Sequence, residues 1–319
     1  MGRYARNSAI LAKLEVTEGT DPVPTGADNA MLVSEITINP LNAQNVDRDF
    51  IRNYFGASEQ LVGTSYVELG FTVELAGSGA AGTAPPWVPL LQACGFALTV
   101  DAAYVSLQPA APSLQKSVTI YYYDDGVLHK LLGAKGNLLP SALVGERPML
   151  KFSFLGRDGG ISAAANPATT LTDFKKPLVV TNTNTADLLF GCTYAAAALS
   201  SGTAHTSRGL TLDVGNAVAF TPLLGGEYVD VTNRAVTGKV QLDLAAAAEV
   251  SFMVDVKANL TQSIGLEHGT VAGNIVGFFM PAVQFINPTK EEINGRRLIG
   301  ADLRSVPVDG NDDLIIYCK

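Results

Sequence analysis

A strict alternation of apolar and polar side chains over residues 66–75, YVELGFTVEL, constrains the fold of this chain more than any other feature. A period of two is that of a β-strand with one face against a core and the other facing water. The pattern therefore predicts a long, half-buried antiparallel strand. Its apolar face would carry Val67, Leu69, Phe71, Val73 and Leu75.

Further strands and few helices are expected along the rest of the chain. Residues 117–123 and 127–132 flank an Asp-Asp-Gly sequence and predict a hairpin with an Asp-Gly turn. Residues 150–155 predict another strand. Only residues 87–95 and 245–259 have the character of helices. The predicted fold class is mainly β, with antiparallel sheets and a short helix in each half.

The chain has 319 residues, but only 16% of them are charged, against about 25% in an average soluble domain. Apolar residues make up 47%, which is ample for a core. Charges are depleted at the centres of protein interfaces because desolvating them is costly. The composition therefore favours a protein whose surface is largely covered by copies of itself. A secreted β-protein with a neutral surface is the alternative.

The balance of charge argues against tight binding of nucleic acid. The formal net charge is −8, and the nearest approaches to a basic cluster are a Lys-Lys pair at 175–176 and an Arg-Arg pair at 296–297. Such a chain repels phosphates, so passive contact with DNA is compatible with it and tight binding is not.

The sequence carries no sign of export or of a membrane anchor. Lys13 and Glu15 interrupt residues 1–16, which lack the apolar segment of a signal peptide. No apolar run approaches the roughly 18 residues that span a bilayer. The three cysteines are odd in number and have no Cys-x-x-Cys spacing, which favours free thiols in a reducing cytoplasm.

A glycine-rich sequence at 77–82, GSGAAG, resembles the phosphate-binding turn of dinucleotide enzymes, and Asp101 follows 19 positions later. That site needs the helix to begin at the glycines, where its N–H groups meet the pyrophosphate. Pro85 and Pro86 delay the helix by about a turn, and the preceding strand alternates instead of being apolar throughout. The sequence therefore predicts a flexible connection and no cofactor.

No arrangement of catalytic or metal-binding residues is apparent. His129, His205 and His268 belong to different predicted elements, without an adjacent cysteine or a second histidine at helical spacing. Residues 309–313, DGNDD, lack the order of a calcium loop and suit the loop of a hairpin. We expect no catalytic residue, no metal and no enzymatic activity.

The two halves of the chain show a similar order of elements. Pro40-Leu41 aligns with Pro222-Leu223, and the strand end at 73–75 aligns with that at 242–244, with a helix next in both halves. The later matches are residues 121–127 with 274–285, and residues 147–154 with 313–318. Two copies of one β-domain explain this pattern, and coincidence of generic strands is the alternative.

Three stretches of the first half carry a family likeness: ILAKLEVTEGTDPVPTGADNAMLVSEITINPL, VDRDFIRNYFGASEQLVGTSYVELGFTVELAGSG and PPWVPLLQACGF. They resemble the major tail tube protein of long-tailed, non-contractile phages, and most closely that of transposable siphophages. The resemblance is sustained over residues 9–157. It is looser over residues 178–319, where the internal repeat supports it.

The resemblance implies a structural virion protein with two tandem tail-tube domains, each an antiparallel β-sandwich or open barrel flanked by a short helix. The first domain, with an N-terminal arm, would be residues 1–157, the linker 158–177 and the second domain 178–319. In this family, domains close into rings, one sheet per domain contributes to an inner barrel, and a long loop reaches the next ring. The genome passes through the lumen during ejection.

The resemblance also implies partners and a location. Expected partners are further copies of the chain, the tape measure protein, other tail proteins and passing double-stranded DNA. The protein would lie in the virion tail after assembly in the host cytoplasm. Single-domain members form hexamers, so a duplicated chain would build a homotrimeric ring with pseudo-hexameric symmetry.

Two sets of residues are predicted to carry this function. Residues 47–65 are expected to form the inter-ring loop, because 31 positions separate Pro40 from Phe71, against 18 between Pro222 and Val240. Its candidates for burial in a neighbouring ring are Phe50, Ile51, Tyr54 and Phe55. The candidates for facing the lumen are Glu68, Thr72, Glu74, Gln241 and Asp243. The residues predicted to turn inward on the same strands are Val67, Phe71, Val73, Val240 and Leu242. An acidic lumen would keep DNA from binding as it passes.

Two other classes of function are weighed against this one. A secreted or surface β-sandwich binding module would have a signal peptide and paired cysteines, and neither is present in this sequence. A cofactor enzyme is opposed by the prolines that follow the glycine-rich sequence.

Overall fold

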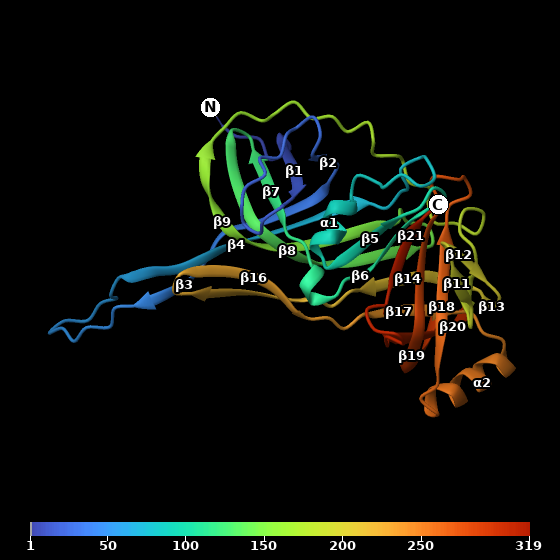
Figure 1. The fold of residues 1–319 in the computed structure, drawn as a ribbon. Helices are drawn as coiled ribbons and strands as arrows, with labels where there is room; N and C mark the ends of the chain where they lie inside the picture. Colours follow the sequence, from blue (N-terminus) through green and yellow to red (C-terminus); the bar gives the residue numbers. More distant parts are fainter. Residues whose placement is uncertain (1) are drawn as a thin grey trace.

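The structure of the chain, a computed structural model, describes residues 2–319 (Figure 1). It consists of antiparallel strands and two short helices, so the prediction of a mainly β fold is confirmed. Within the described residues, pairing links seventeen strands into one network, and two hairpins stand apart from it.

The elements of the first half come first. A 3-10 turn lies at Pro112–Leu114. In chain order the other elements are β1 (Ser8–Leu14), β2 (Ala30–Met31), β3 (Ser34–Asp47), β4 (Gln60–Glu74), α1 (Val88–Ala93), β5 (Phe96–Val100), β6 (Val105–Pro109), β7 (Val118–Asp124), β8 (Val127–Leu143) and β9 (Met149–Ala163).

The second half continues the series. Its elements are β10 (Leu188–Phe190), β11 (Thr193–Ala195), β12 (Ala198–Ser200), β13 (Thr203–His205), β14 (Ser207–Asp213), β15 (Ala217–Leu223), β16 (Gly226–Asn233), β17 (Thr237–Leu242), α2 (Ala246–Lys257), β18 (Thr261–His268), β19 (Val276–Ile293), β20 (Arg296–Ser305) and β21 (Ile315–Cys318). Both predicted helices are therefore present.

The predicted hairpin of β7 and β8 is also present, and its turn has the expected chemistry. Asp125 and Gly126 occupy the turn with φ of 41° and 93°. A two-residue hairpin turn of this type needs positive φ at both positions, which is why an Asp-Gly pair favours it.

Strand pairing gives the two halves the same order. In the first half the strands run β1–β7–β8–β9–β4–β3, each antiparallel to its neighbour. In the second half they run β10–β18–β19–β20–β17–β14, again antiparallel. A helix follows β4, and another follows β17. Each strand of the first order thus has a counterpart in the second.

The correspondence extends to a bulge near the start of β3 and of β14. The pairing of β3 with β4 shifts between Ser34 and Thr37, and that of β14 with β17 shifts between Ser207 and Leu210. The bulges contain Glu35 and Gly209, which both have left-handed backbone, with φ of 54° and 102°. Left-handed residues are uncommon in strands. The two halves therefore share geometric detail as well as strand order.

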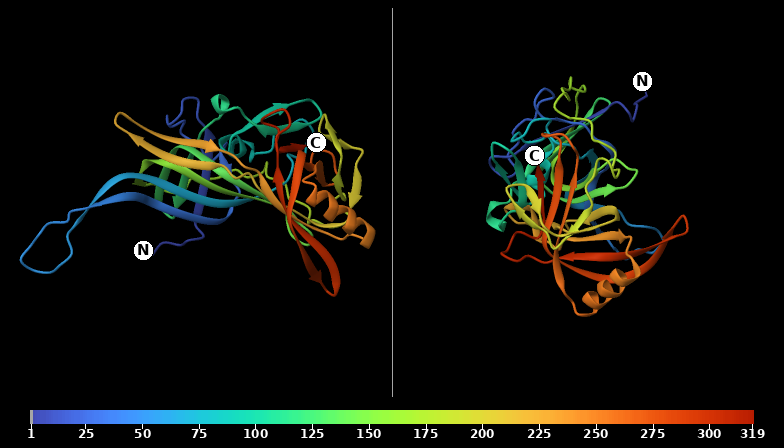
Figure 2. Two further views of the ribbon diagram at one scale, coloured as in Figure 1. Left: turned by 90° about the horizontal axis from the view of Figure 1, so that it is seen from below. Right: turned by 90° about the vertical axis from the view of Figure 1, so that its right-hand side faces the viewer.

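Two pairings join the halves to each other. Residues 141–143 of β8 pair with residues 209–211 of β14, and Leu107 of β6 pairs with Ile316 of β21. The first pairing creates a sheet of eight strands, which we call the long sheet: β3–β4–β9–β8–β14–β17–β20–β19. The long sheet therefore runs without a break from the first half of the chain into the second. Figure 2 shows the molecule from two further sides.

The core lies on one side of the long sheet. Phe71 of β4 packs on Phe152 and Phe154 of β9, with ring centroids 5.8 and 5.7 Å apart. Trp87, just before α1, is 1% exposed, and its indole N–H donates to the carbonyl of Ala76 at 2.9 Å. Burial of one such side chain contributes about 1.5–3 kcal/mol. The residues predicted to turn inward are all 2% exposed or less: Val67, Phe71, Val73, Val240 and Leu242.

The glycine-rich connection at 77–82 is a contact between the halves. The N–H of Gly77 donates to Oδ1 of Asn274 at 2.8 Å, and that of Gly79 donates to the carbonyl of Gly273 at 2.9 Å. A β-carbon on Gly77 would lie 2.2 Å from the Gly273 oxygen, so glycine is needed for this approach. The helix α1 begins only at Val88, after the prolines, as the sequence predicts.

Two hairpins extend from the long sheet. The first arm is the part of β3 and β4 that projects farthest in Figure 1, with its tip at residues 48–59. The second arm is the β15–β16 hairpin, which turns at Leu224 and Gly225. The second arm packs against β8 and β9 of the first half. The ring centroid of Phe220 on this arm also lies 5.2 Å from that of Tyr66 on β4.

Three predicted boundaries differ from the structure. The expected loop at 47–65 is shorter, because β4 already begins at Gln60. The strand β9 extends to Ala163, into the expected linker 158–177, although glycines hide its alternation. Residues 309–313 connect β20 to β21, but each of these strands pairs with β19 and not with the other, so they form no hairpin.

The internal alignment drawn from the sequence is correct beside the helices. Val73 of β4 pairs with Leu150 of β9, and Leu242 of β17 pairs with Ile299 of β20. Val73 therefore corresponds to Leu242, and Leu150 corresponds to Ile299. The counterpart of β9 is therefore β20, and that of β8 is β19. The later matches, 121–127 with 274–285 and 147–154 with 313–318, are each displaced by one strand.

The proline match is wrong, and the two arms differ less in length than it implied. Asn39 lies opposite Glu68, and Asp213 lies opposite Thr237. Glu68 lies 5 positions before Val73, and Thr237 lies 5 positions before Leu242, so Glu68 corresponds to Thr237 and Asn39 to Asp213. Because 29 positions separate the first pair and 24 the second, the first arm is longer by 5 residues and not by 13.

Candidate functional site

The residues predicted to face a lumen lie on the polar face of the long sheet. They alternate with buried residues along β4 and along β17 and its end: Glu68, Thr72, Glu74, Gln241 and Asp243. Thr72 is nevertheless only 4% exposed, and its hydroxyl donates to Oε2 of Glu35 at 2.9 Å. Because β8 pairs with β14, the residues on β4 and those on β17 lie on one continuous surface.

Paired charges, and not a purely acidic surface, occupy this polar face. Arg147 forms an ion pair with Glu74, and Arg296 forms one with Asp243. The side chain of Lys239 on β17 is 79% exposed. Exposed ion pairs add little stability, but each places a cation beside an acid and weakens its field. The predicted lumen-facing acids Glu74 and Asp243 are therefore each paired with a cation, and that this face lines a lumen stays a prediction.

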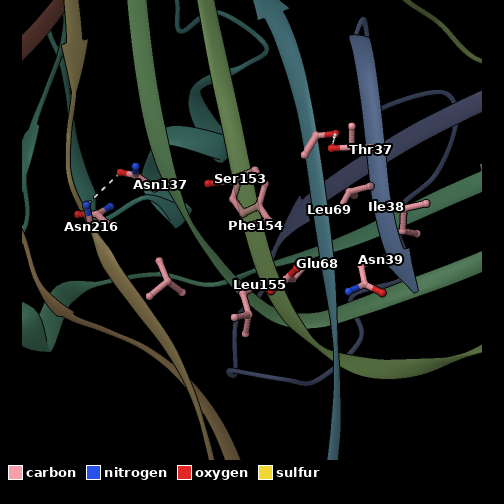
Figure 3. A pocket seen from close by; sticks show the side chains of 12 residues that line it. Thr37, Ile38, Asn39, Glu68, Leu69, Asn137, Ser153, Phe154, Leu155 and Asn216 are labelled. Carbon is pink, nitrogen blue, oxygen red and sulfur yellow. Dashed lines mark hydrogen bonds between the residues drawn. The ribbon is translucent and has the colours of Figure 1, made fainter. Parts of the chain in front are cut away.

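A groove crosses the polar face of the first half (Figure 3). Its polar lining comes from β3, β4, β9, β8 and the segment before β15: Thr37, Asn39, Glu68, Ser153, Asn137 and Asn216. Glu68 is the one titratable side chain among the described residues that line it, and it accepts a hydrogen bond from Nδ2 of Asn42 at 3.1 Å.

The groove ends at a hydrogen-bonded joint between the halves. Nδ2 of Asn216 donates to the carbonyls of Cys94 at 2.7 Å and Gly136 at 2.9 Å, and the N–H of Asn216 donates to Oδ1 of Asn137 at 3.0 Å. Nδ2 of Asn137 donates in turn to Oδ1 of Asp213 at 2.8 Å. No pattern in the sequence pointed to these asparagines, because their partners are distant along the chain.

A buried cation forms a second tie between the halves. Lys135 of β8 is 5% exposed. Its Nζ lies 3.1 Å from Oε2 of Glu18 and 3.2 Å from Oδ1 of Asp230 on β16. A buried ammonium group is costly unless acids compensate it, and here the two acids come from different halves. Lys135 therefore connects the first half with the second arm.

The tip of the first arm exposes large apolar side chains. The four residues predicted for it are 56%, 104%, 65% and 107% exposed, in the order Phe50, Ile51, Tyr54 and Phe55. The guanidinium carbons of Arg48 and Arg52 lie 5.0 and 5.8 Å from the ring centroids of Phe50 and Tyr54. A cluster of apolar side chains on a projecting hairpin marks a surface for contact with another protein.

Both ring nitrogens of the buried His268 have partners within the fold. His268 is 3% exposed, with Nδ1 2.8 Å from Oγ1 of Thr185 and Nε2 3.1 Å from the carbonyl of Leu178. Burial lowers the pKa of His268, and it also lowers the pKa of His129 and of His205. These histidines therefore stay neutral in the folded chain near pH 7.

The three cysteines are buried and free. Burial raises the pKa of the Cys318 thiol to about 12 and raises that of Cys94 strongly as well, so neither is an activated nucleophile. Across residues 2–319, no three His, Cys, Asp or Glu side chains are grouped as ligands for a metal ion. Neither helix in that range has the length and apolarity that crossing a membrane requires.

A family model matches nearly the whole chain. The family is described as phage tail tube protein, and the match covers residues 5–313. The chain belongs to the phage tail tube protein family. The match includes both halves, whereas the likeness read from the sequence was sustained only over residues 9–157. A comparison with curated proteins found no match.

Membership of the phage tail tube family makes this chain a structural component of the virion tail, which associates with copies of itself and with other tail components. The exposed arm tip and the extended sheet are surfaces suited to such association.

Proposed function

We propose that copies of this tail tube protein close into rings, that the rings stack into a tube, and that the genome passes through the tube during ejection. The observation that carries the proposal is the presence, in a tail tube chain, of two kinds of association surface: an exposed apolar arm tip and a sheet with two unpaired ends. The role is structural and not enzymatic. The tail is of the non-contractile siphophage type, which the N-terminal likeness supports.

The chain is, in this proposal, a pair of tail tube domains. The shared strand order and the paired bulges support a first domain that ends with β9 and a second that starts near residue 178. Three chains would then present six domains in a homotrimeric, pseudo-hexameric ring. The mass of one ring tests this: three times 33.4 kDa supports the proposal, and six times that mass contradicts it.

The first arm is the contact between successive rings. Phe50, Ile51, Tyr54 and Phe55 would be buried in the neighbouring ring, which explains why a soluble chain exposes them. Replacing Ile51 and Phe55 with aspartate should leave folded subunits that form no long tubes in negative-stain images, and deleting residues 50–58 should do the same. Val16→Asp, at a position 101% exposed outside the arm, is the matched control. Normal tubes from the arm variants would exclude this role.

The polar face of the long sheet borders the lumen. Its pairing of acids with cations limits both attraction and repulsion, so that DNA slides past Glu68, Thr72, Glu74, Gln241 and Asp243 without being held. Changing Glu68, Glu74 and Asp243 to lysine would free Arg147 and Arg296 and add positive charge. DNA ejection should then slow at low salt, with glutamine and asparagine variants as controls. Unchanged ejection would place this face on the outside.

The further partners are those that the family resemblance implies. The tape measure protein would occupy the lumen before the DNA does, and other tail proteins would cap the tube, which is assembled in the host cytoplasm. A net charge of −8 fits passage of DNA without tight binding. The alternative of a secreted binding module loses its support with the family match. Rings or tubes in images of the purified protein would support the proposal, and dispersed monomers at high concentration would contradict it.

A further inference from the structure

The strand pairing between β8 and β14, which we call the central joint of the long sheet, provides a template for the contact between two copies. At the centre of the long sheet, β8 pairs with β14. The counterparts of these strands, β19 and β3, form the two ends of the same sheet. Among the described strands, residues 289–293 of β19 pair with β20 alone, and β3 pairs with β4 alone. Each end therefore presents an open ladder of the kind that is closed at the centre.

We infer that the end of β19 in one copy pairs with the start of β3 in the next copy, in the register that β8 and β14 use, and that Glu292 weakens this pairing. The inference rests on the proposed ring. It adds the surface, the register and the residue that sets the strength of the contact.

The register on the first strand follows from the strand opposite. Pro140 of β8 lies opposite Leu150, and Lys290 of β19 lies opposite Ile299. Leu150 and Ile299 correspond, so Pro140 and Lys290 also correspond. The next three residues of each strand then match in order: Ser141 with Glu291, Ala142 with Glu292, and Leu143 with Ile293.

The register on the second strand follows from the shared bulge. Gly209 and Glu35 hold the same left-handed position, so residues 209–211 correspond to residues 35–37. Within the chain the pairs are Leu143 with Gly209, Ala142 with Leu210, and Ser141 with Thr211. Between copies the pairs become Ile293 with Glu35, Glu292 with Ile36, and Glu291 with Thr37.

A proline shortens the ladder between copies. Within the chain, the N–H of Val214 extends the joint by donating to the carbonyl of Leu138 at 3.0 Å. The counterpart of Val214 is Pro40, one position after Asn39, and proline has no N–H to donate. The contact between copies is therefore shorter than the one within the chain.

The two joints differ most in charge at one position. Ala142 and Leu210 are 1% and 2% exposed, so the central pair within the chain is apolar and buried. The corresponding pair between copies is Glu292 with Ile36. Lys290 lies on the same side of β19 and forms an ion pair with Glu249 of α2 at 3.0 Å, and Arg297 lies opposite Glu292 in the hairpin.

A carboxylate at this position must lose water when the second copy covers it, which costs free energy that alanine does not cost. Inward-pointing charges on edge strands protect sheets from unwanted pairing in the same way. Free subunits therefore stay apart, although their edges match. The joint within the chain is permanent, and the joint between copies forms only when other contacts add to it.

A pair of cysteines tests the register. Residues directly opposite in an antiparallel pair have Cα atoms about 4.5–5.5 Å apart, which suits a disulfide. In assembled tubes, a chain with both Glu292→Cys and Ile36→Cys should link to its neighbours and give a ladder of multimers on non-reducing gels. The native cysteines are buried and should not compete.

Two matched pairs serve as controls for the register. Ala142→Cys with Leu210→Cys should link the chain to itself and keep the monomer mass. Lys290→Cys with Ile36→Cys is displaced by two residues and should not link. Tubes that form without the Glu292–Ile36 link, or with the displaced link instead, would overturn this register and leave the proposed function intact. Wild-type protein that never forms rings or tubes would contradict the proposed function itself.

Substitution of Glu292 tests its effect on strength. Glu292→Ala restores the residue found at the central joint, and should lower the protein concentration needed for lateral association at least tenfold, measured by sedimentation velocity. Glu292→Gln should have a smaller effect, since the amide still loses water. Asp309→Ala, in an exposed loop, removes the same charge away from the edge and should leave association unchanged. Association of Glu292→Ala equal to that of Asp309→Ala would refute the role of Glu292.

Discussion

Replacing Asn216 with alanine tests how firmly the two halves of the subunit are joined. The change removes Nδ2, and with it the hydrogen bonds to the carbonyls of Cys94 and Gly136. Both acceptor residues are buried, so water does not readily replace the lost donor. The bond from the N–H of residue 216 to Asn137 survives, because alanine keeps that group.

The expected loss can be worked from these contacts. A neutral hydrogen bond contributes about 0.5–1.5 kcal/mol net, and a buried group left without a partner costs about 1–3 kcal/mol. Oδ1 of Asn216 is buried without a partner among the described residues, so its removal gives a partial relief. Two lost bonds less this relief reduce the free energy of unfolding by about 2 kcal/mol. Aspartate should cost more, because a carboxylate oxygen would then face both carbonyls.

Urea unfolding of the isolated subunit measures this loss. The single tryptophan, Trp87, lies just before α1, whose last turn adjoins Cys94, so its fluorescence reports on the joint. Asn42→Ala is the matched control, since its amide makes one bond to Glu68 near the surface. A loss within about 0.5 kcal/mol for Asn216→Ala, the usual range for surface changes, would refute the reasoning. Equal effects of alanine and aspartate would refute it too.

Three further outcomes follow from groups described above. Stability should fall as the pH drops from about 7 toward 5, because burial lowers the pKa of His268 and only the unfolded chain readily takes up the proton; His268→Asn should flatten part of this dependence of the urea midpoint. The Cys318 thiol, with its pKa near 12, should react with a thiol reagent only when β21 leaves its partners, so the labelling rate in native buffer should be far below that in urea. Gly77→Ala should lower stability by about 1–3 kcal/mol through its clash with the Gly273 carbonyl, whereas Gly56→Ala, with no atom within 4 Å, should be neutral in the same thermal melts.

The sequence was sufficient where local pattern decides the structure. Alternation around Phe71 and Val240 placed the correct faces inward, because each side chain of a strand has only two directions available. Pro85 and Pro86 excluded a phosphate site for a reason that is also local. The exposure of Ile51 and its neighbours followed from apolar residues in a stretch with no alternation.

The rest depends on contacts between residues far apart in the chain. Nothing near Asn216 or Lys135 in the sequence reveals that each joins the two halves, since their partners lie 79 or more positions away. The alignment of the halves failed for a related reason. Pro222 resembles Pro40 in its neighbours, but only strand pairing shows that the corresponding residue is Val214. Strand register is set by the whole sheet and not by short matches.

The two unlike joints of the long sheet have a consequence for how such a subunit can evolve. A ring of identical single domains repeats one lateral contact, so every substitution there alters all contacts at once. In the proposed ring of this chain, the contact at Ala142 and its counterpart at Glu292 are encoded separately. Selection can therefore act on the joint within the chain for the stability of the subunit, and on the joint between copies for when subunits associate. A mutation in the joint between copies leaves the folding of the subunit untouched.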